Sequence, residues 1–165
     1  MNRWAKLSTA VLAATVVAAS NASAQSANIN VTATVFQAIT VTGTADLAFG
    51  NVFPGINKTI AVADPTSGRW SATGQASAQV ALTFTLPTNL VNGGNNLPIT
   101  GWTGCHNSTN VPAGCTGFTP SGTATNAAFS AGGQLFVFIG GTVQPAANQV
   151  AGNYTAVATL TLAYF

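Results

Sequence analysis

The sequence predicts an all-β fold, and three observations support this prediction. Strong helix formers are almost absent, because the chain after residue 24 has no Glu and no Met and is rich in Thr, Ala, Val, Asn and Gly. Short runs of alternating apolar and polar residues recur and are separated by Gly, Pro, Asn and Asp. No helical periodicity longer than a turn interrupts them. Together these features indicate an antiparallel β-sandwich or barrel.

The first 24 residues have the features of a secretory signal peptide. Two basic residues precede the apolar run of residues 7–19, which is too short to span a bilayer, and small residues at 22–24 form a cleavage site. Cleavage between Ala24 and Gln25 is expected to leave one domain of ordinary length; an uncleaved anchor is the alternative. We therefore expect export through the inner membrane, and a place at the cell surface or outside the cell.

After that cleavage the chain carries almost no charge. Its only charged side chains are Asp46, Asp64, Lys58 and Arg69, so its net charge is zero. No basic patch for nucleic acid and no acidic run for cations remain. Because a net charge near zero favours association, the composition is more typical of a polymer subunit than of a freely diffusing enzyme.

Alternating runs mark the expected strands in chain order. The first is residues 29–35, where Ile29, Val31, Ala33 and Val35 share one face. Further strands are expected around residues 39–41, 60–62, 70–72, 80–86 and 99–102. Residues 91–96 read as a polar loop and Gly140-Gly141 as a turn. Residues 135–139 are apolar on both faces, which predicts a central strand.

The closing residues 154–165 predict one long strand. Their even-numbered positions from 154 to 164 are apolar or aromatic, and three of the intervening positions are Thr. Chain termini usually fray, so a strong strand reaching Phe165 suggests an end held by its own sheet or by a partner.

Cys105 and Cys115 are the only cysteines, and in an exported chain such a pair predicts a disulfide. The bond would close a short loop and contribute about 3 kcal/mol. His106 next to Cys105 raises a metal-site alternative, but a fourth ligand is missing nearby, so the structural disulfide is favoured.

Groups that could perform catalysis are scarce. There is one His, there are two Asp residues at turn-like positions, and neither a nucleophile elbow nor a phosphate-binding loop occurs. We therefore expect no enzymatic activity, no metal and no cofactor. Trp102 and Phe118 flank the cysteine loop and would suit sugar stacking if they were exposed; otherwise they belong to the core.

Several segments resemble a known family. These are residues 44–55, Thr-Ala-Asp-Leu-Ala-Phe-Gly-Asn-Val-Phe-Pro-Gly, then Gly-Gly-Thr-Val at 140–143, Asn-Gln at 148–149, Ala-Gly-Asn-Tyr at 151–154, and the closing strand. Together they resemble an uncharacterised bacterial family of secreted, pilin-like domains. The Gly-x-Tyr motif before a terminal strand also resembles the motif found in fimbrial major subunits of the chaperone–usher type.

The resemblance implies an immunoglobulin-like antiparallel β-sandwich that can lack its final strand. In the fimbrial subunits a periplasmic chaperone first fills the gap, and the N-terminal extension of the next subunit then replaces it at an outer-membrane usher. By this resemblance residues 25–36 are the extension or donor strand, residues 37–165 are the sandwich, and the C-terminal strand faces the chaperone. The residues implied for donation are Ile29, Val31, Ala33 and Val35, and those implied to face the chaperone are Leu160, Leu162, Tyr164 and Phe165.

The expected function is therefore that of a structural subunit of a fimbria or pilus that supports surface attachment. Its main partners would be copies of itself, with no nucleic acid bound and no transmembrane segment after residue 24. Two alternatives stay open. Residues 29–35 either pair within their own sandwich or are donated to another copy. The protein could also be a secreted monomeric or matrix β-sandwich that binds carbohydrate or surfaces.

Overall fold

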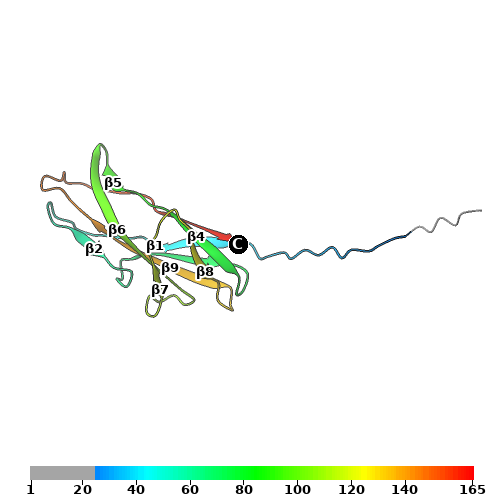
Figure 1. The fold of residues 1–165 in the computed structure, drawn as a ribbon. Coiled ribbons are helices and arrows are strands. Elements are labelled where there is room, and N and C mark those ends of the chain that lie inside the picture. The colour runs from blue at the N-terminus through cyan, green and yellow to red at the C-terminus, as the bar shows by residue number, and fades with distance from the viewer. Residues whose placement is uncertain (1–24) are drawn as a thin grey trace, which may run out of the picture. The chain divides into compact units, whose positions relative to one another are not determined.

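The computed structural model describes residues 25–165 (Figure 1). The predicted signal peptide, including Ala24 on the N-terminal side of the cleavage site, lies outside the described residues. The chain divides between Thr34 and Val35 into two units, and each is described by itself.

Residues 35–165 form an all-β domain, as predicted. Within residues 25–165 there are ten strands and no helix, and hence no helix that could cross a membrane. The strands are β1 (Thr40–Ala45), β2 (Lys58–Ile60), β3 (Gly68–Thr73), β4 (Gln79–Thr85), β5 (Asn89–Asn92), β6 (Asn95–Asn107), β7 (Thr116–Phe118), β8 (Thr125–Ala128), β9 (Gln134–Val143) and β10 (Thr159–Tyr164).

Two antiparallel sheets form a sandwich-like arrangement (Figure 1). The larger sheet has the order β1-β3-β9-β6-β5, with β2 also paired to β9 and β7 paired to β6. The smaller sheet has only three strands, in the order β10-β4-β8. The main core lies where buried side chains of β4 and β10 pack with those of β3 and β9; its largest members include Leu82, Phe84, Leu135, Val137 and Leu160.

The prediction of a central strand at residues 135–139 is confirmed. These residues belong to β9, which pairs with β3 on one side and β6 on the other. Val137, Phe138 and Ile139 are at most 2% exposed. A strand covered on both faces needs apolar side chains at successive positions, so it does not show the alternation of a half-exposed strand.

The prediction of a turn at Gly140-Gly141 is wrong. Both glycines are buried inside β9. A Cβ atom on Gly140 would meet the backbone carbonyl oxygen of Ile60 in β2 and would lie 3.0 Å from Thr103 Oγ1. A glycine is needed here because another backbone approaches closely. Besides forming turns, glycine commonly permits such close approaches within strands.

The loop predicted at residues 91–96 is also wrong, because this region is the β5–β6 hairpin. Asn92 pairs with Asn95, and the turn between them is Gly93-Gly94. Gly93 has φ +59°, a conformation that glycine adopts without steric cost. The strand expected near residues 99–102 is part of the 13-residue β6.

The closing strand is shorter than predicted. β10 begins at Thr159, opposite Thr85 at the end of β4. Pro87 follows two residues after Thr85 and has no N–H group to donate, so the ladder with β4 does not continue. Upstream, only Thr155 makes a bridge, to Val91, and residues 156–158 belong to no strand.

Residues 29–35 form no strand in this single chain, although their sequence alternates like one. Ile29, Val31 and Val35 are 85%, 89% and 91% exposed. The first strand of the domain is β1, which begins at Thr40. No strand precedes β1 among the described residues.

Candidate functional site

A groove with an apolar floor lies on the domain. It consists of two neighbouring cavities of about 430 and 770 Å³. Both cavities are lined by the same five residues: Leu47, Phe49, Leu90, Tyr154 and Thr155. Because they share these walls, the two cavities adjoin, and we call them together the lateral groove.

Two irregular segments form the walls of the lateral groove. One wall is the chain after β1, up to Pro54, and the other is residues 149–158, which lead into β10. Three apolar side chains on these walls stand largely in solvent: Phe53 is 64% exposed, Val150 is 52% exposed and Val157 is 80% exposed. Exposed apolar side chains gathered around a groove are typical of a binding surface.

Side chains from the strands of the larger sheet form the floor of the groove. Trp70, Trp102 and Ile139 contribute to the first cavity, and Leu97 and Val143 contribute to the second. The same side chains belong to the core clusters or pack against them, so the groove opens directly onto the core. Asp46 and Arg69 are the charged residues that line it.

Hydrogen bonds fix the second wall around Tyr154. The Tyr154 hydroxyl donates to the carbonyl of Val150 at 2.7 Å, and Gln149 Nε2 donates to that hydroxyl at 2.7 Å and to the carbonyl of Asn96 at 3.1 Å. Thr155 and Val91 exchange both backbone bonds, at 2.9 and 3.0 Å. The Asn-Gln and Gly-x-Tyr motifs of the sequence therefore contain the two side chains that hold this wall.

Residues 156–158, in contrast, lack backbone partners. No backbone hydrogen bond joins Ala156, Val157 or Ala158 to another described residue. These residues lie between the Thr155 bridge and the start of β10, and all three line the groove. Their N–H and C=O groups are available to an incoming strand.

Tyr164 holds the point at which the N-terminal segment joins the domain. Its hydroxyl donates to the carbonyl of Gln37 and accepts from the backbone N–H of Gln75, both at 2.7 Å. Its ring stacks on Phe36, with centroids 5.0 Å apart. A Cβ atom on Gly74 would lie 2.6 Å from the Tyr164 hydroxyl, so only glycine leaves room for this contact.

The residues predicted to face a chaperone are mostly turned inward. Leu160 is 7% exposed, and Leu162 and Tyr164 are half-buried and pack against the core. Only Phe165 is largely exposed, at 70%. The structure thus brings three of these four residues together, but within the domain rather than on its surface.

The residues predicted as a donor strand belong to no strand of the structure. Ile29, Val31, Ala33 and Val35 are all exposed. Gln25, on the C-terminal side of the predicted cleavage site, is exposed as well.

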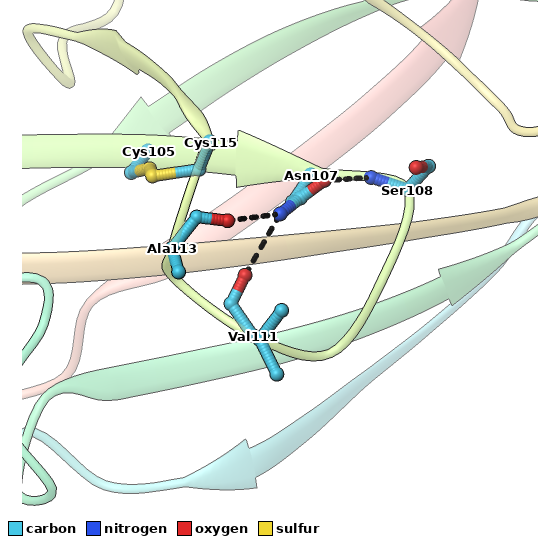
Figure 2. Close-up of a disulfide and its surroundings, with 6 residues drawn as sticks. All are labelled: Cys105, Asn107, Ser108, Val111, Ala113 and Cys115. Atoms are coloured by element: carbon cyan, nitrogen blue, oxygen red, sulfur yellow. Dashed lines mark hydrogen bonds between the residues drawn. A yellow bond between two sulfur atoms is a disulfide. The ribbon is translucent and has the colours of Figure 1, made fainter.

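The predicted disulfide is present between Cys105 in β6 and Cys115, with the Cα atoms 5.8 Å apart (Figure 2). The loop that it closes is ordered by Asn107. Asn107 Nδ2 donates to the carbonyl of Val111 at 2.8 Å and to that of Ala113 at 3.2 Å, and Figure 2 marks both bonds by dashed lines. The backbone N–H of Ser108 donates to Asn107 Oδ1 at 2.8 Å. Sequence reasoning missed Asn107, because only the folded loop brings these carbonyls to it.

The side chains near this loop form no open aromatic platform. Phe118 is half-buried and packs against Phe84, with ring centroids 5.5 Å apart, and Trp102 is half-buried in the groove floor. His106 lies beside Phe118, and burial lowers the pKa of its imidazole. In the described part of the chain, no three His, Cys, Asp or Glu side chains lie close enough to hold a metal ion.

Comparison with known proteins gives a family match. The model of a family described as a domain of unknown function (DUF4402) matches residues 39–164. This range contains all ten strands and both walls of the lateral groove, and it begins after the exposed run of residues 29–35. No curated protein matches the chain.

Proposed function

The chain belongs to the DUF4402 family, and we propose that it is a structural subunit of an extracellular filament assembled by β-strand donation. The observation that carries this proposal is the exposed run of residues 29–35. It has four apolar side chains on one face, uses none of them in a sheet of its own, and leaves the three largest at least 85% exposed. A segment with this pattern is stabilised when it adds to the edge of a sheet and its side chains enter pockets.

The charge of the described chain supports association between copies. Residues 25–165 contain only four charged side chains, two of each sign, so repulsion between copies is weak. Because the donating segment and the accepting surface are different parts of the chain, the contact is head-to-tail. A head-to-tail contact that does not close builds an open filament.

This role implies that the chain is exported and that its apolar surfaces are covered until it assembles at the cell surface. A chain with exposed apolar residues at both the N-terminal segment and the lateral groove would need cover before assembly. A periplasmic chaperone and an outer-membrane usher, as in the fimbrial subunits that the sequence resembles, would supply it. A filament built in this way would support surface attachment.

The proposal can be tested with a pair of matched variants of the full chain. The first replaces Ile29, Val31 and Val35 by Asn, and the second replaces Asn30, Thr32 and Thr34 by Ala. Both keep the length of the segment, but only the first removes its apolar face. Filament formation would be followed by electron microscopy and analytical ultracentrifugation.

The proposal predicts that the first variant stays folded and monomeric, while the second assembles like the unaltered chain. If the unaltered chain stays monomeric under conditions that favour assembly, or if the first variant still polymerises, strand donation is excluded. A persistent monomer would favour the secreted, surface-binding alternative.

A further inference from the structure

We propose that the lateral groove is the acceptor, and that residues 29–35 of a second copy lie in it alongside residues 156–158. This inference rests on the proposed function, because it names the surface that strand donation would use. It narrows the sequence-based expectation, in which the closing strand of residues 154–165 faces the partner, to the stretch before β10.

The smaller sheet is the one that can accept a strand here. It has three strands, and β10 is at its edge. The backbone of Ala156, Val157 and Ala158 continues toward β10 without hydrogen bonds to other described residues. An added strand would satisfy these groups and lengthen the ordered edge of the sheet, which is the usual basis of affinity in strand addition.

The floor of the groove matches the side chains of the proposed occupant. Trp70, Trp102 and Ile139 present an apolar surface, and the small side chains of Ala156 and Ala158 leave space above it. The occupant offers Ile, Val and Ala on one face and has no charged residue between positions 25 and 36. The occupant itself would therefore bring no charge that has to lose its hydration on binding.

The lengths also agree. Seven extended residues, 29–35, span about 23 Å, and the three residues 156–158 span about 10 Å when extended. The two cavities share lining residues along this wall. A seven-residue strand is therefore long enough to pair with residues 156–158 and to continue beyond them.

The length of chain needed to get from Gln37 to the groove favours a second copy, and not the chain's own segment, as the source of the strand. Gln37 is held at Tyr164, which is at the far end of β10 from residues 156–158. The six residues of β10 span about 20 Å. The chain's own residues 31–36 would be used up in crossing that distance, so only the residues before them could reach the groove.

Residues 160–164 do not line the lateral groove. Leu160 is buried, and Leu162 and Tyr164 already pack against the core. The Tyr164 hydroxyl has both a donor and an acceptor within the domain. The part of this edge that a strand in the groove would meet is therefore the stretch before β10.

The test is cysteine cross-linking between two forms of the full chain. Donor forms carry Ile29→Cys, Val31→Cys or Val35→Cys, and the acceptor form carries Ala156→Cys, at an exposed position on the groove wall. A matched acceptor form carries Asn126→Cys, which is also exposed but lies on β8, at the opposite edge of the same sheet. Mixed samples are oxidised mildly and analysed for heterodimers.

We expect heterodimers between at least one donor form and Ala156→Cys, and at least about tenfold fewer with Asn126→Cys. Equal cross-linking at both positions, or none at Ala156→Cys, would overturn the assignment of the groove. If assembly still requires the apolar face of residues 29–35 in that case, only the acceptor assignment fails. If assembly no longer requires that face, the proposed function fails with it.

A second pair of variants avoids the need for new cysteines. Ala156→Arg places a charge on the groove wall, and Ala163→Arg places one at another exposed position on β10. We expect Ala156→Arg to weaken assembly at least about tenfold, because the charge would be buried under the incoming strand. Ala163→Arg should assemble normally; an equal loss in both variants, or in neither, would contradict the proposal.

Discussion

Two segments of this protein share one sequence pattern but differ in structure. Residues 29–35 and β10 both alternate apolar and polar side chains. In β10 the apolar face is covered, with Leu160 7% exposed and paired opposite Phe84 of β4. In residues 29–35 the same kind of face is open, with Ile29 85% exposed. A period of two therefore specifies a strand and its buried face, but not the strand with which it pairs.

The largest expected effect separates these two segments directly. Leu160→Ala should lower the free energy of unfolding of the monomer by about 2–5 kcal/mol, because it leaves a cavity in the core. Ile29→Ala, its counterpart in the N-terminal segment, should change it by less than about 0.5 kcal/mol. Urea denaturation at a concentration that keeps the protein monomeric measures both. Similar losses in both variants would show that residues 29–35 pack within their own domain.

The disulfide lies outside both segments and provides a reference for the stability of the domain. Reduction of the Cys105–Cys115 bond should lower the free energy of unfolding by about 3 kcal/mol, since it frees the closed loop in the unfolded chain. The loss should be equal in the unaltered chain and in the triple Asn variant of residues 29, 31 and 35. A Cys105→Ala, Cys115→Ala variant should not respond to the reductant. A different loss in the triple variant would mean that the segment contributes to the fold.

Tyr164 in β10 contacts Phe36 and Gln37, which follow residues 29–35 in the chain, and its substitution tests those contacts. Tyr164→Phe keeps the ring but loses the hydrogen bonds to Gln37 and Gln75, so it should cost about 1–2 kcal/mol of unfolding free energy. Hydrogen exchange at the Gln75 amide should become faster. Phe165→Ala, at the exposed neighbouring position, should have little effect. Unchanged exchange at Gln75 would rule out the proposed anchoring.

The smallest expected effect is on the pH dependence of stability. Burial lowers the pKa of His106 in the folded protein below its ordinary value of 6.5, so the unfolded chain binds the proton more readily. Stability is therefore complete above pH 6.5 and falls as the pH drops through 6.5 toward the lowered pKa. Thermal unfolding at neutral and mildly acidic pH should show this decrease. His106→Gln should remove it; a decrease that persists in this variant would assign it to another group.

The all-β fold, the central strand and the disulfide could be predicted from the sequence, because composition, local alternation and a single cysteine pair determine them. The length of β10 could not, because it depends on Pro87 near the end of its partner strand β4. Gly140 was misread as a turn, because its small size is required by β2, far away in the sequence. The contacts of Tyr164 join residues 89 and 127 positions apart, which no local pattern encodes.

The lateral groove could not be predicted from local sequence patterns either. The motifs around residues 44–55 and 148–154 were recognised in the sequence, but their common purpose was not visible there. In the structure they form the two facing walls of one depression. What the sequence did show is the alternating, uncharged segment at residues 29–35 that could fill it.

Hydrogen exchange of residues 156–158 measures whether an added strand pairs with their backbone. The domain would be prepared without residues 25–35, a segment that contributes no strand to it, and mixed with a peptide of residues 25–36. A peptide with Asn at positions 29, 31 and 35 would serve as the control. Our account predicts that the amides of Ala156, Val157 and Ala158 exchange rapidly in the free domain and become protected only with the natural peptide. Unchanged exchange at these amides, or equal protection by the control peptide, would contradict it.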